Sequence, residues 1–149
     1  MLVPILMGSE SDKEFASKIT SILDEWEVPY SLHVASAHKV PEKVIEIVNK
    51  YNAESDPICY ITIAGRSNGL SGVVAASSVH PVIACPPFQS KEDMMINVNS
   101  SLQMPSDTPV MTLIDPQNAA MAVIRILANY DANLRKKVEA HIVKIKAKF

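Results

Sequence analysis

Short apolar runs alternate along this chain with longer segments of helical periodicity. The runs span residues 2–7, 30–35, 58–64, 81–84 and 110–114. Their Val, Ile and Leu content is typical of strands buried on both faces, and strands that alternate with helices form parallel βαβ units. The pattern therefore predicts an α/β fold, a three-layer α/β/α sandwich of the Rossmann-like or flavodoxin-like type with a mainly parallel five-stranded sheet.

The segments between the runs indicate where the helices lie. Apolar residues recur at spacings of three and four from Ser11 to Trp26, and a second helix is predicted from Pro41, at the first helical turn, to Tyr51. Small residues at 70–78 indicate a third helix. The polar segment 88–106 is expected to be a functional loop with a short helix at 93–97, its methionines closing over an apolar pocket.

The carboxyl-terminal region is expected to be one long helical segment. It begins after the cap pair Asp115-Pro116, is apolar on nearly every side over 119–128, and continues as an amphipathic helix to Lys148. A helix so apolar needs cover on two faces. Packing on its own sheet and burial at a subunit interface both satisfy that need.

Length and composition limit the class of protein. A chain of 149 residues with 48% hydrophobic and 20% charged residues is expected to form one domain, 1–149. A net charge of -2 provides no broad basic field for nucleic acid but is compatible with a local anion pocket. Cys59 and Cys85 form no metal-binding or disulfide pattern. We expect a soluble, cytoplasmic protein with no metal, nucleic-acid or membrane partner.

Three polar, small-residue segments follow the first three apolar runs. Because the carboxyl ends of parallel strands meet at one sheet edge, these segments are predicted to converge into a site. The candidate binding residues are Gly8, Ser9, Ser11, Asp12, Ser36, Lys39, Gly65, Arg66, Ser67, Asn68 and Gly69. Serine hydroxyls beside a helix amino terminus favour a phosphate, and the carboxylate of Asp12 suits a ribose hydroxyl.

His38 is the candidate for proton transfer, since imidazole both accepts and donates a proton near neutral pH. Each loop also has a purely structural interpretation. Ser11 or Asp12 could only cap a helix, and Arg66 could form a structural salt bridge. Likewise Asn68 could turn the chain, and Ser67 could cap the next helix.

Five ordered motifs together resemble the PurE family of purine biosynthesis over essentially the whole chain. They are Met7-Gly8-Ser9-x-Ser11-Asp12, Ser36-Ala37-His38-Lys39, Ala64-Gly65-Arg66-Ser67-Asn68-Gly69-Leu70, Cys85-Pro86-Pro87 and Ser100-Ser101-Leu102-Gln103-Met104-Pro105. The resemblance implies an enzyme acting on 5-aminoimidazole ribonucleotide (AIR). It also implies that His38 is the general acid/base, that no cofactor is needed, and that the chain assembles as a homo-octamer.

The family has two reaction types, and this chain resembles the class II carboxylases, which add carbon dioxide directly to AIR. The mutase branch typically has His-Arg in the second motif and a histidine in the third loop, where this chain has Lys39 and Arg66-Ser67-Asn68. By resemblance, Lys39 and Ser67 orient carbon dioxide or stabilise the new carboxylate, and Lys39 could instead contact phosphate. The segment 70–78 lacks the Gly-Pro of many animal carboxylases.

Two other functions remain open from the sequence. One is the N5-carboxyaminoimidazole ribonucleotide mutase, which would share His38 and most of the nucleotide site. The other is a flavodoxin-like binding module without catalysis, in which the loop 8–12 holds a phosphate. The scarcity of aromatic residues, 5% of the chain, argues against a stacked flavin.

Overall fold

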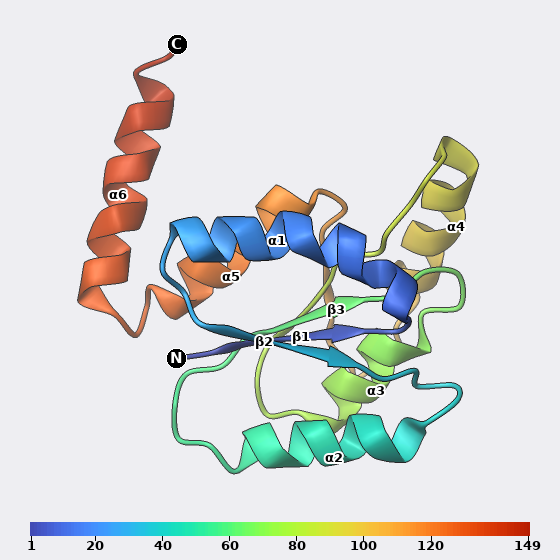
Figure 1. The fold of residues 1–149 in the computed structure, drawn as a ribbon. Helices are drawn as coiled ribbons and strands as arrows, with labels where there is room; N and C mark the ends of the chain where they lie inside the picture. The colour runs from blue at the N-terminus through green and yellow to red at the C-terminus, as the bar shows by residue number, and fades with distance from the viewer.

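A computed structural model describes residues 1–149 and shows one parallel sheet between layers of helices (Figure 1). The strands are β1 (Val3–Met7), β2 (Tyr30–Val34), β3 (Tyr60–Ile63), β4 (Val82–Ala84) and β5 (Met111–Thr112). Every neighbouring pair is parallel, in the order β2-β1-β3-β4-β5. All five predicted strands and the predicted fold class are confirmed, and this order is that of the flavodoxin-like doubly wound sheets.

Helices connect the strands and cover both faces of the sheet. They are the 3-10 turn η1 (Glu10–Asp12), α1 (Lys13–Glu25), α2 (Pro41–Asn52), α3 (Gly69–Ser77), α4 (Lys91–Leu102), α5 (Pro116–Leu127) and α6 (Ala132–Lys146). Figure 1 shows α1 and α5 on one face and α2 and α3 on the other. None of the helices combines the length and apolar character that a membrane span requires.

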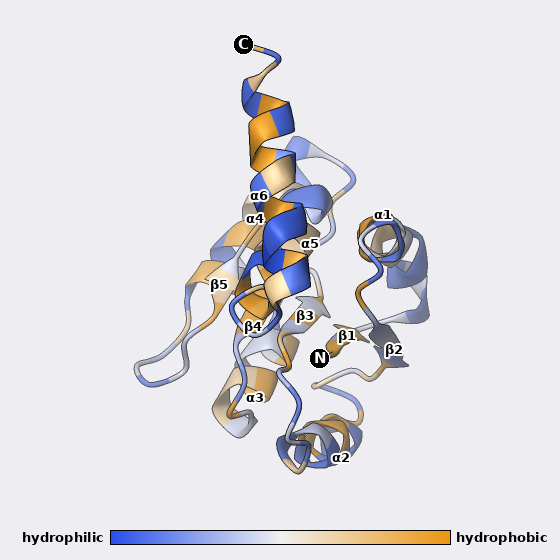
Figure 2. Cartoon of the chain, turned by 90° about the vertical axis from the view of Figure 1, so that its left-hand side faces the viewer, coloured by the Kyte–Doolittle hydropathy of each residue, from blue (hydrophilic) through white to orange (hydrophobic).

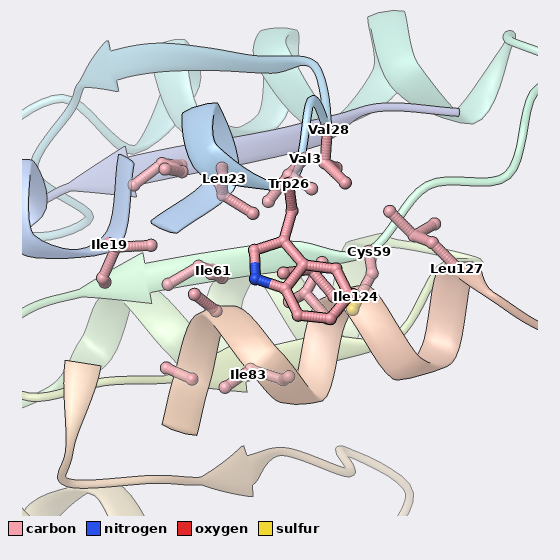
Figure 3. Close-up of a cluster of buried hydrophobic side chains, with 14 of the residues drawn as sticks. Val3, Ile19, Leu23, Trp26, Val28, Cys59, Ile61, Ile83, Ile124 and Leu127 are labelled. Carbon is pink, nitrogen blue, oxygen red and sulfur yellow. The ribbon is translucent and has the colours of Figure 1, made fainter. Parts of the chain in front are cut away.

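The strands separate two hydrophobic clusters because alternate side chains point to opposite faces. Val3, Ile61 and Ile83 face α1 and α5, where they pack with Leu23 and Ile124 in the larger cluster (Figure 3). The second cluster lies against α2 and α3 and includes Leu6, Val48 and Val74. Both faces of the sheet are thus covered, as the composition of the strands predicts.

The carboxyl-terminal region is two helices rather than one. Asn129 donates from its side-chain amide to the carbonyls of Arg125 and Ile126, which ends α5, and Asp131 caps α6 by accepting the Leu134 N–H at 2.8 Å. Buried side chains of α5, including Val123 and Ile124, pack on the sheet and on α1. The first half of α6 joins the larger cluster through Leu134 and Val138, at the end of the sheet where the strands begin, and its outer half extends away from the sheet (Figure 1).

The segment after β4 also differs from the expectation. It holds α4, a helix of 12 residues that begins at a Ser90 cap, whereas the sequence predicts only a short helix at 93–97 within a loop. Ser90 Oγ accepts the Asp93 N–H at 3.1 Å, and two acidic residues follow in the first turn. These are ordinary helix-start signals, but the weak apolar periodicity of the segment concealed its length.

Candidate active site

A polar cleft of about 940 Å³ lies at the carboxyl edge of the sheet. Its walls come from the loops after β1, β2, β3 and β4 and from the first half of α1. The three polar segments therefore converge in the structure, as predicted. Nine of the eleven candidate binding residues line the cleft, together with His38. The cleft has the size of a small-molecule site.

The loop after β1 is held by a reciprocal capping box. Ser9 Oγ accepts the Ser11 N–H at 3.3 Å, and Asp12 Oδ2 accepts the Ser9 N–H at 2.9 Å. Partial burial raises the pKa of Asp12 above its ordinary value, although hydrogen bonds from the Ser9 and Gly8 backbones oppose the shift. Ser9 and Asp12 thus cap the helical turn and also line the cleft.

The loop after β2 presents His38 on a tight turn. Ser36 accepts backbone hydrogen bonds from Lys39 at 3.2 Å and from Val40 at 2.9 Å, so the histidine lies at the exposed bend. Its imidazole lies against the backbone of Gly69, where an added Cβ would come within 2.8 Å of Nε2. Glycine at the start of α3 therefore leaves the space that the ring occupies.

The loop after β3 brings Arg66 and Ser67 to the cleft. Arg66 adopts a left-handed backbone with φ of +54°, which is uncommon for a residue with a Cβ. No carboxylate lies within ion-pair distance of its guanidinium, so the structure does not have the predicted alternative of a salt bridge. The cap of α3 is Asn68 rather than Ser67, which leaves the Ser67 hydroxyl at the cleft.

Two candidate binding residues stand behind the wall instead of on it. The side chain of Asn68 is buried, with 5% of its surface exposed, and Oδ1 accepts from the backbone N–H of Ser71 at 3.1 Å. Gly69 lies behind His38, as described above. The structure therefore assigns Asn68 to the support of the loop and Gly69 to the placement of the imidazole, because both are used inside the protein.

Several residues that line the cleft are not among the predicted ones. Phe15 and Lys18 enter from α1, one and two turns beyond Ser11, at the helical spacing of four and three. This helical spacing is the sequence pattern from which Phe15 and Lys18 could have been predicted to line the cleft. Phe88 and Asn97 come from the segment after β4, whose place beside the cleft is a tertiary property. None of the methionines of 88–106 lines the cleft, so the expected apolar lid is replaced by a polar wall.

Positive charge gathers in the cleft without internal neutralisation. Lys18, Lys39 and Arg66 line it, and none of the three is in an ion pair of the chain. Asp12 and Asp93 are also present, so the cleft offers cations for an anionic group and carboxylates for hydroxyl donors of a ligand. A phosphorylated sugar has both kinds of group.

Neither cysteine offers a nucleophile to the cleft. Burial raises the pKa of the Cys85 thiol to about 12, with a further contribution from Asp115, and burial alone does the same for Cys59. A thiol with such a pKa stays protonated near neutral pH. The chain also contains no cluster of three side chains able to hold a metal ion. His38 is the only histidine that lines the cleft.

Comparison with known proteins agrees with the motifs. A family model described as AIR carboxylase matches residues 2–148. A phosphoribosylaminoimidazole carboxylase of Archaeoglobus fulgidus is 43% identical over 138 residues, which cover 93% of this chain and 75% of that protein. An N5-carboxyaminoimidazole ribonucleotide mutase of Methanocaldococcus jannaschii is 44% identical over 149 residues, covering 99% and 92%. The crystal structure of Treponema denticola PurE matches with a TM-score of 0.91 and 40% identity, over 99% of this chain and 92% of that one.

Proposed function

Because the chain belongs to the AIR carboxylase family, we propose that it is an AIR carboxylase that adds carbon dioxide to AIR reversibly, giving the C4-carboxylated nucleotide CAIR. The observation that carries the proposal is the position of His38 at a cleft that also holds three unpaired cations and the serine loop 8–12. This arrangement provides an acid/base group beside a site for a phosphorylated ribose.

The chemistry requires one proton acceptor. The electron-rich C4 of AIR attacks the carbon of carbon dioxide, forming a carbon–carbon bond while one oxygen takes the negative charge. The ring carbon then carries both a carboxylate and a hydrogen, and His38 removes that proton so that the ring regains its aromaticity. In the reverse direction His38 returns the proton to C4 and carbon dioxide leaves. The scheme uses no cofactor.

The remaining cleft residues are assigned to binding. Ser9, Ser11 and Ser36 donate to the phosphate, and Asp12 accepts from a ribose hydroxyl. The raised pKa of Asp12 supports this assignment, because a carboxyl whose charge is already disfavoured by burial is stabilised by a hydroxyl donor. Gly8 and Gly65 line the cleft on either side, and the guanidinium of Arg66 adds positive charge near the nucleotide.

Lys39 and Ser67 are assigned to the carbon dioxide and the new carboxylate. Lys39 follows His38 on the loop after β2, and Ser67 lies on the loop after β3. Both residues line the cleft, and both are donors able to stabilise charge as it develops on oxygen. Lys39 also lies within the loop that carries Ser36, so contact with the phosphate is the second role open to it. A substitution that separates the nucleotide affinity from the turnover number decides between the two roles.

The mutase reaction is the second candidate, and the 44% identity with the Methanocaldococcus jannaschii mutase favours it. A mutase would bind N5-carboxyaminoimidazole ribonucleotide and move the carboxylate to C4, using the same cleft. The carboxylase is preferred because Lys39 and the Arg66-Ser67-Asn68 loop resemble that branch. The third candidate, a non-catalytic binding module, fits the sheet order but provides no role for His38 at the cleft.

We also propose that the enzyme is a cytoplasmic homo-oligomer, an octamer by family resemblance. On α4 a polar side chain is buried and apolar ones are exposed: Asn97 is buried, while Met95 and Ile96 each expose 54% of their surface. The outer half of α6, which extends away from the sheet, contains apolar residues (Figure 2), and Val143 among them is 68% exposed. Neighbouring copies covering these helices would bury that surface. Two free cysteines suit a reducing compartment.

A paired assay tests the reaction. The purified protein is mixed with AIR and bicarbonate-derived carbon dioxide, and separately with N5-carboxyaminoimidazole ribonucleotide, and CAIR formation is followed after correction for spontaneous breakdown of the N5 compound. The carboxylase predicts a CAIR rate that tracks carbon dioxide. Product from the N5 compound alone would establish the mutase, and product from neither, with bound AIR, would leave only the binding module.

A further inference from the structure

The five buried threonine, asparagine and serine residues of the chain are joined by hydrogen bonds behind the loop that follows β3, and Asn97 enters this group through its backbone carbonyl. The five residues are Thr62, Asn68, Ser71, Asn97 and Ser101. Ser71 Oγ lies 2.8 Å from Thr62 Oγ1 and donates to Asn68 Oδ1 at 2.9 Å. The group continues to α4, since Asn68 Nδ2 donates to Ser101 Oγ at 2.9 Å and Ser101 Oγ donates to the Asn97 carbonyl at 2.8 Å. A satisfied buried network of this kind holds its members in one arrangement.

The side-chain amide of Asn97 joins two walls of the cleft. Its Oδ1 accepts the backbone N–H of Arg66, and its Nδ2 donates to the carbonyl of Pro87 at 2.6 Å. Arg66 belongs to the wall after β3 and Pro87 to the wall after β4, and both residues line the cleft. The side chain is 2% exposed, so water does not compete with either hydrogen bond.

The hydrogen bond from Asn97 to Arg66 is made at a residue whose backbone conformation is unfavourable. A residue with a Cβ holds a left-handed conformation only where the surrounding structure compensates for it, and Arg66 has φ of +54°. The preceding residue shows how closely Asn97 approaches, because an added Cβ at Gly65 would lie 3.1 Å from Asn97 Nδ2. The absence of a side chain at Gly65 is thus explained by Asn97.

We propose that Asn97 is a positioning residue of the active site, one that holds the left-handed Arg66 and so places Ser67 against the carbon dioxide position. This inference rests on the proposed function, because it assigns the residue to the carboxylation step. Asn97 makes no hydrogen bond to the loops after β1 and β2, whose serines and Asp12 are assigned to the phosphate and the ribose, and it reaches the nucleotide site only through Arg66. Its loss should therefore lower turnover much more than nucleotide affinity.

The test compares two asparagines of the same chemistry at opposite ends of the sheet. Asn52 also bridges two backbone groups, since Nδ2 donates to the Ser77 carbonyl at 2.8 Å and Oδ1 accepts from Val79 N–H at 3.2 Å, but it does not line the cleft. Asn97→Ala and Asn52→Ala each remove one such bridge. Both are assayed for AIR binding, for carboxylation and for thermal unfolding of the full chain.

We expect Asn97→Ala to reduce kcat by roughly 10- to 100-fold, as displaced catalytic groups do, while the Kd for AIR changes much less. The Asn52→Ala variant should lower only the melting temperature. Unchanged kcat in a folded Asn97→Ala protein, or an equal loss of kcat in both variants, would overturn the assignment.

Asn97→Asp keeps the proposal testable if the alanine variant does not fold. The introduced carboxylate still accepts a hydrogen bond from Arg66 N–H. Its other oxygen faces the Pro87 carbonyl, so two acceptors oppose each other there until protonation of the carboxylate restores a donor. Burial and the facing carbonyl raise the pKa of that carboxyl. We expect the kcat of this variant relative to wild type to rise as the pH falls, and a constant ratio would contradict the proposal.

Hydrogen exchange separates this inference from the proposed function. The Arg66 amide should exchange faster in Asn97→Ala than in wild type and should be unaffected in Asn52→Ala. If wild type converts neither nucleotide, the proposed function fails, and faster exchange at Arg66 would still show that Asn97 holds the loop. If wild type is active and Arg66 exchange does not change, only the positioning role fails.

Discussion

The two faces of the sheet are built from different side chains, although the same strands form both. The buried side chains under α1 and α5 are apolar, from Val3 and Ile61 to Ile124 (Figure 3). The opposite face carries Thr62, and beside it lie the other buried polar residues, which lead to the cleft through α3 and α4. One face therefore supplies most of the hydrophobic stabilisation, while the other holds the loops of the site in place.

The largest effect is expected at the cleft itself. His38→Asn removes the acid/base group but occupies a similar volume, so kcat should fall by roughly 10²- to 10⁴-fold while AIR binding and the melting temperature stay close to wild type. Turnover is measured by CAIR formation. Near-wild-type turnover would remove His38 from the mechanism.

The apolar face should show the reverse behaviour. Ile124 is fully buried in the larger cluster, and Ile124→Ala should lower the free energy of unfolding by about 2 to 5 kcal/mol through the lost contacts and the cavity. Below the melting temperature its kcat/KM should be unchanged. Val79→Ala is the control, since that side chain is 78% exposed. A specific loss of kcat in Ile124→Ala would show that the two faces are coupled.

Lys39→Ala should affect function without unfolding the chain. The side chain is exposed at the cleft and is in no ion pair, so its loss removes a charge-assisted hydrogen bond to the ligand, worth about 1.5 to 3 kcal/mol. A raised Kd for AIR would place Lys39 at the phosphate, and a lowered kcat would place it at carbon dioxide. Lys50→Ala, remote from the cleft, is the matched control. A destabilised but fully active Lys39→Ala protein would contradict both roles.

A smaller effect is expected where the polar group begins. Thr62 Oγ1 lies 2.8 Å from Ser71 Oγ and 3.3 Å from the Ile83 carbonyl, so Thr62→Val removes a buried hydroxyl at a cost of about 1 kcal/mol in unfolding free energy. Ile83→Val, on the apolar face of the next strand, should cost a similar amount. Only Thr62→Val should also lower kcat, because only it touches the group that supports the loop. Equal kcat values in the two variants would limit that group to stability.

The smallest expected effect is a pH dependence of stability. The pKa of Asp12 is raised in the folded state, mainly by burial, so the folded chain binds more protons at this site than the unfolded chain around the ordinary carboxyl pKa. Ionised Asp12 therefore lowers stability at neutral pH, and this loss disappears as the pH falls below that range. Asp12→Asn should melt slightly higher than wild type at pH 7 and equally at pH 3. A lower melting temperature at pH 7 would contradict the sign.

The strands and most of the cleft could be predicted because they depend on local patterns. Short apolar runs show where β1 and β3 lie, and parallel topology then requires that Ser9, His38 and Ser67 meet at one edge. The length of α4 was not predicted, because its apolar periodicity is weak. The break at Asn129 was not predicted, because the apolar periodicity continues up to it and the helix is ended by a side-chain cap. The partner of Arg66 could not be predicted, because Asn97 is 31 residues away and lies on a separate helix.

The sequence by itself determined the five strands and their succession along the chain, the fold class, and the three loops that carry polar chemistry, since all of these follow from periodicity and from the rule for parallel strands. Only the tertiary structure decided which polar residues face the cleft and which support it. Asn68 and Ser67 are neighbours, yet one is buried as a helix cap and the other is exposed at the site. That choice depends on partners from α4, and hydrogen bonds between distant segments form only when the whole chain is packed.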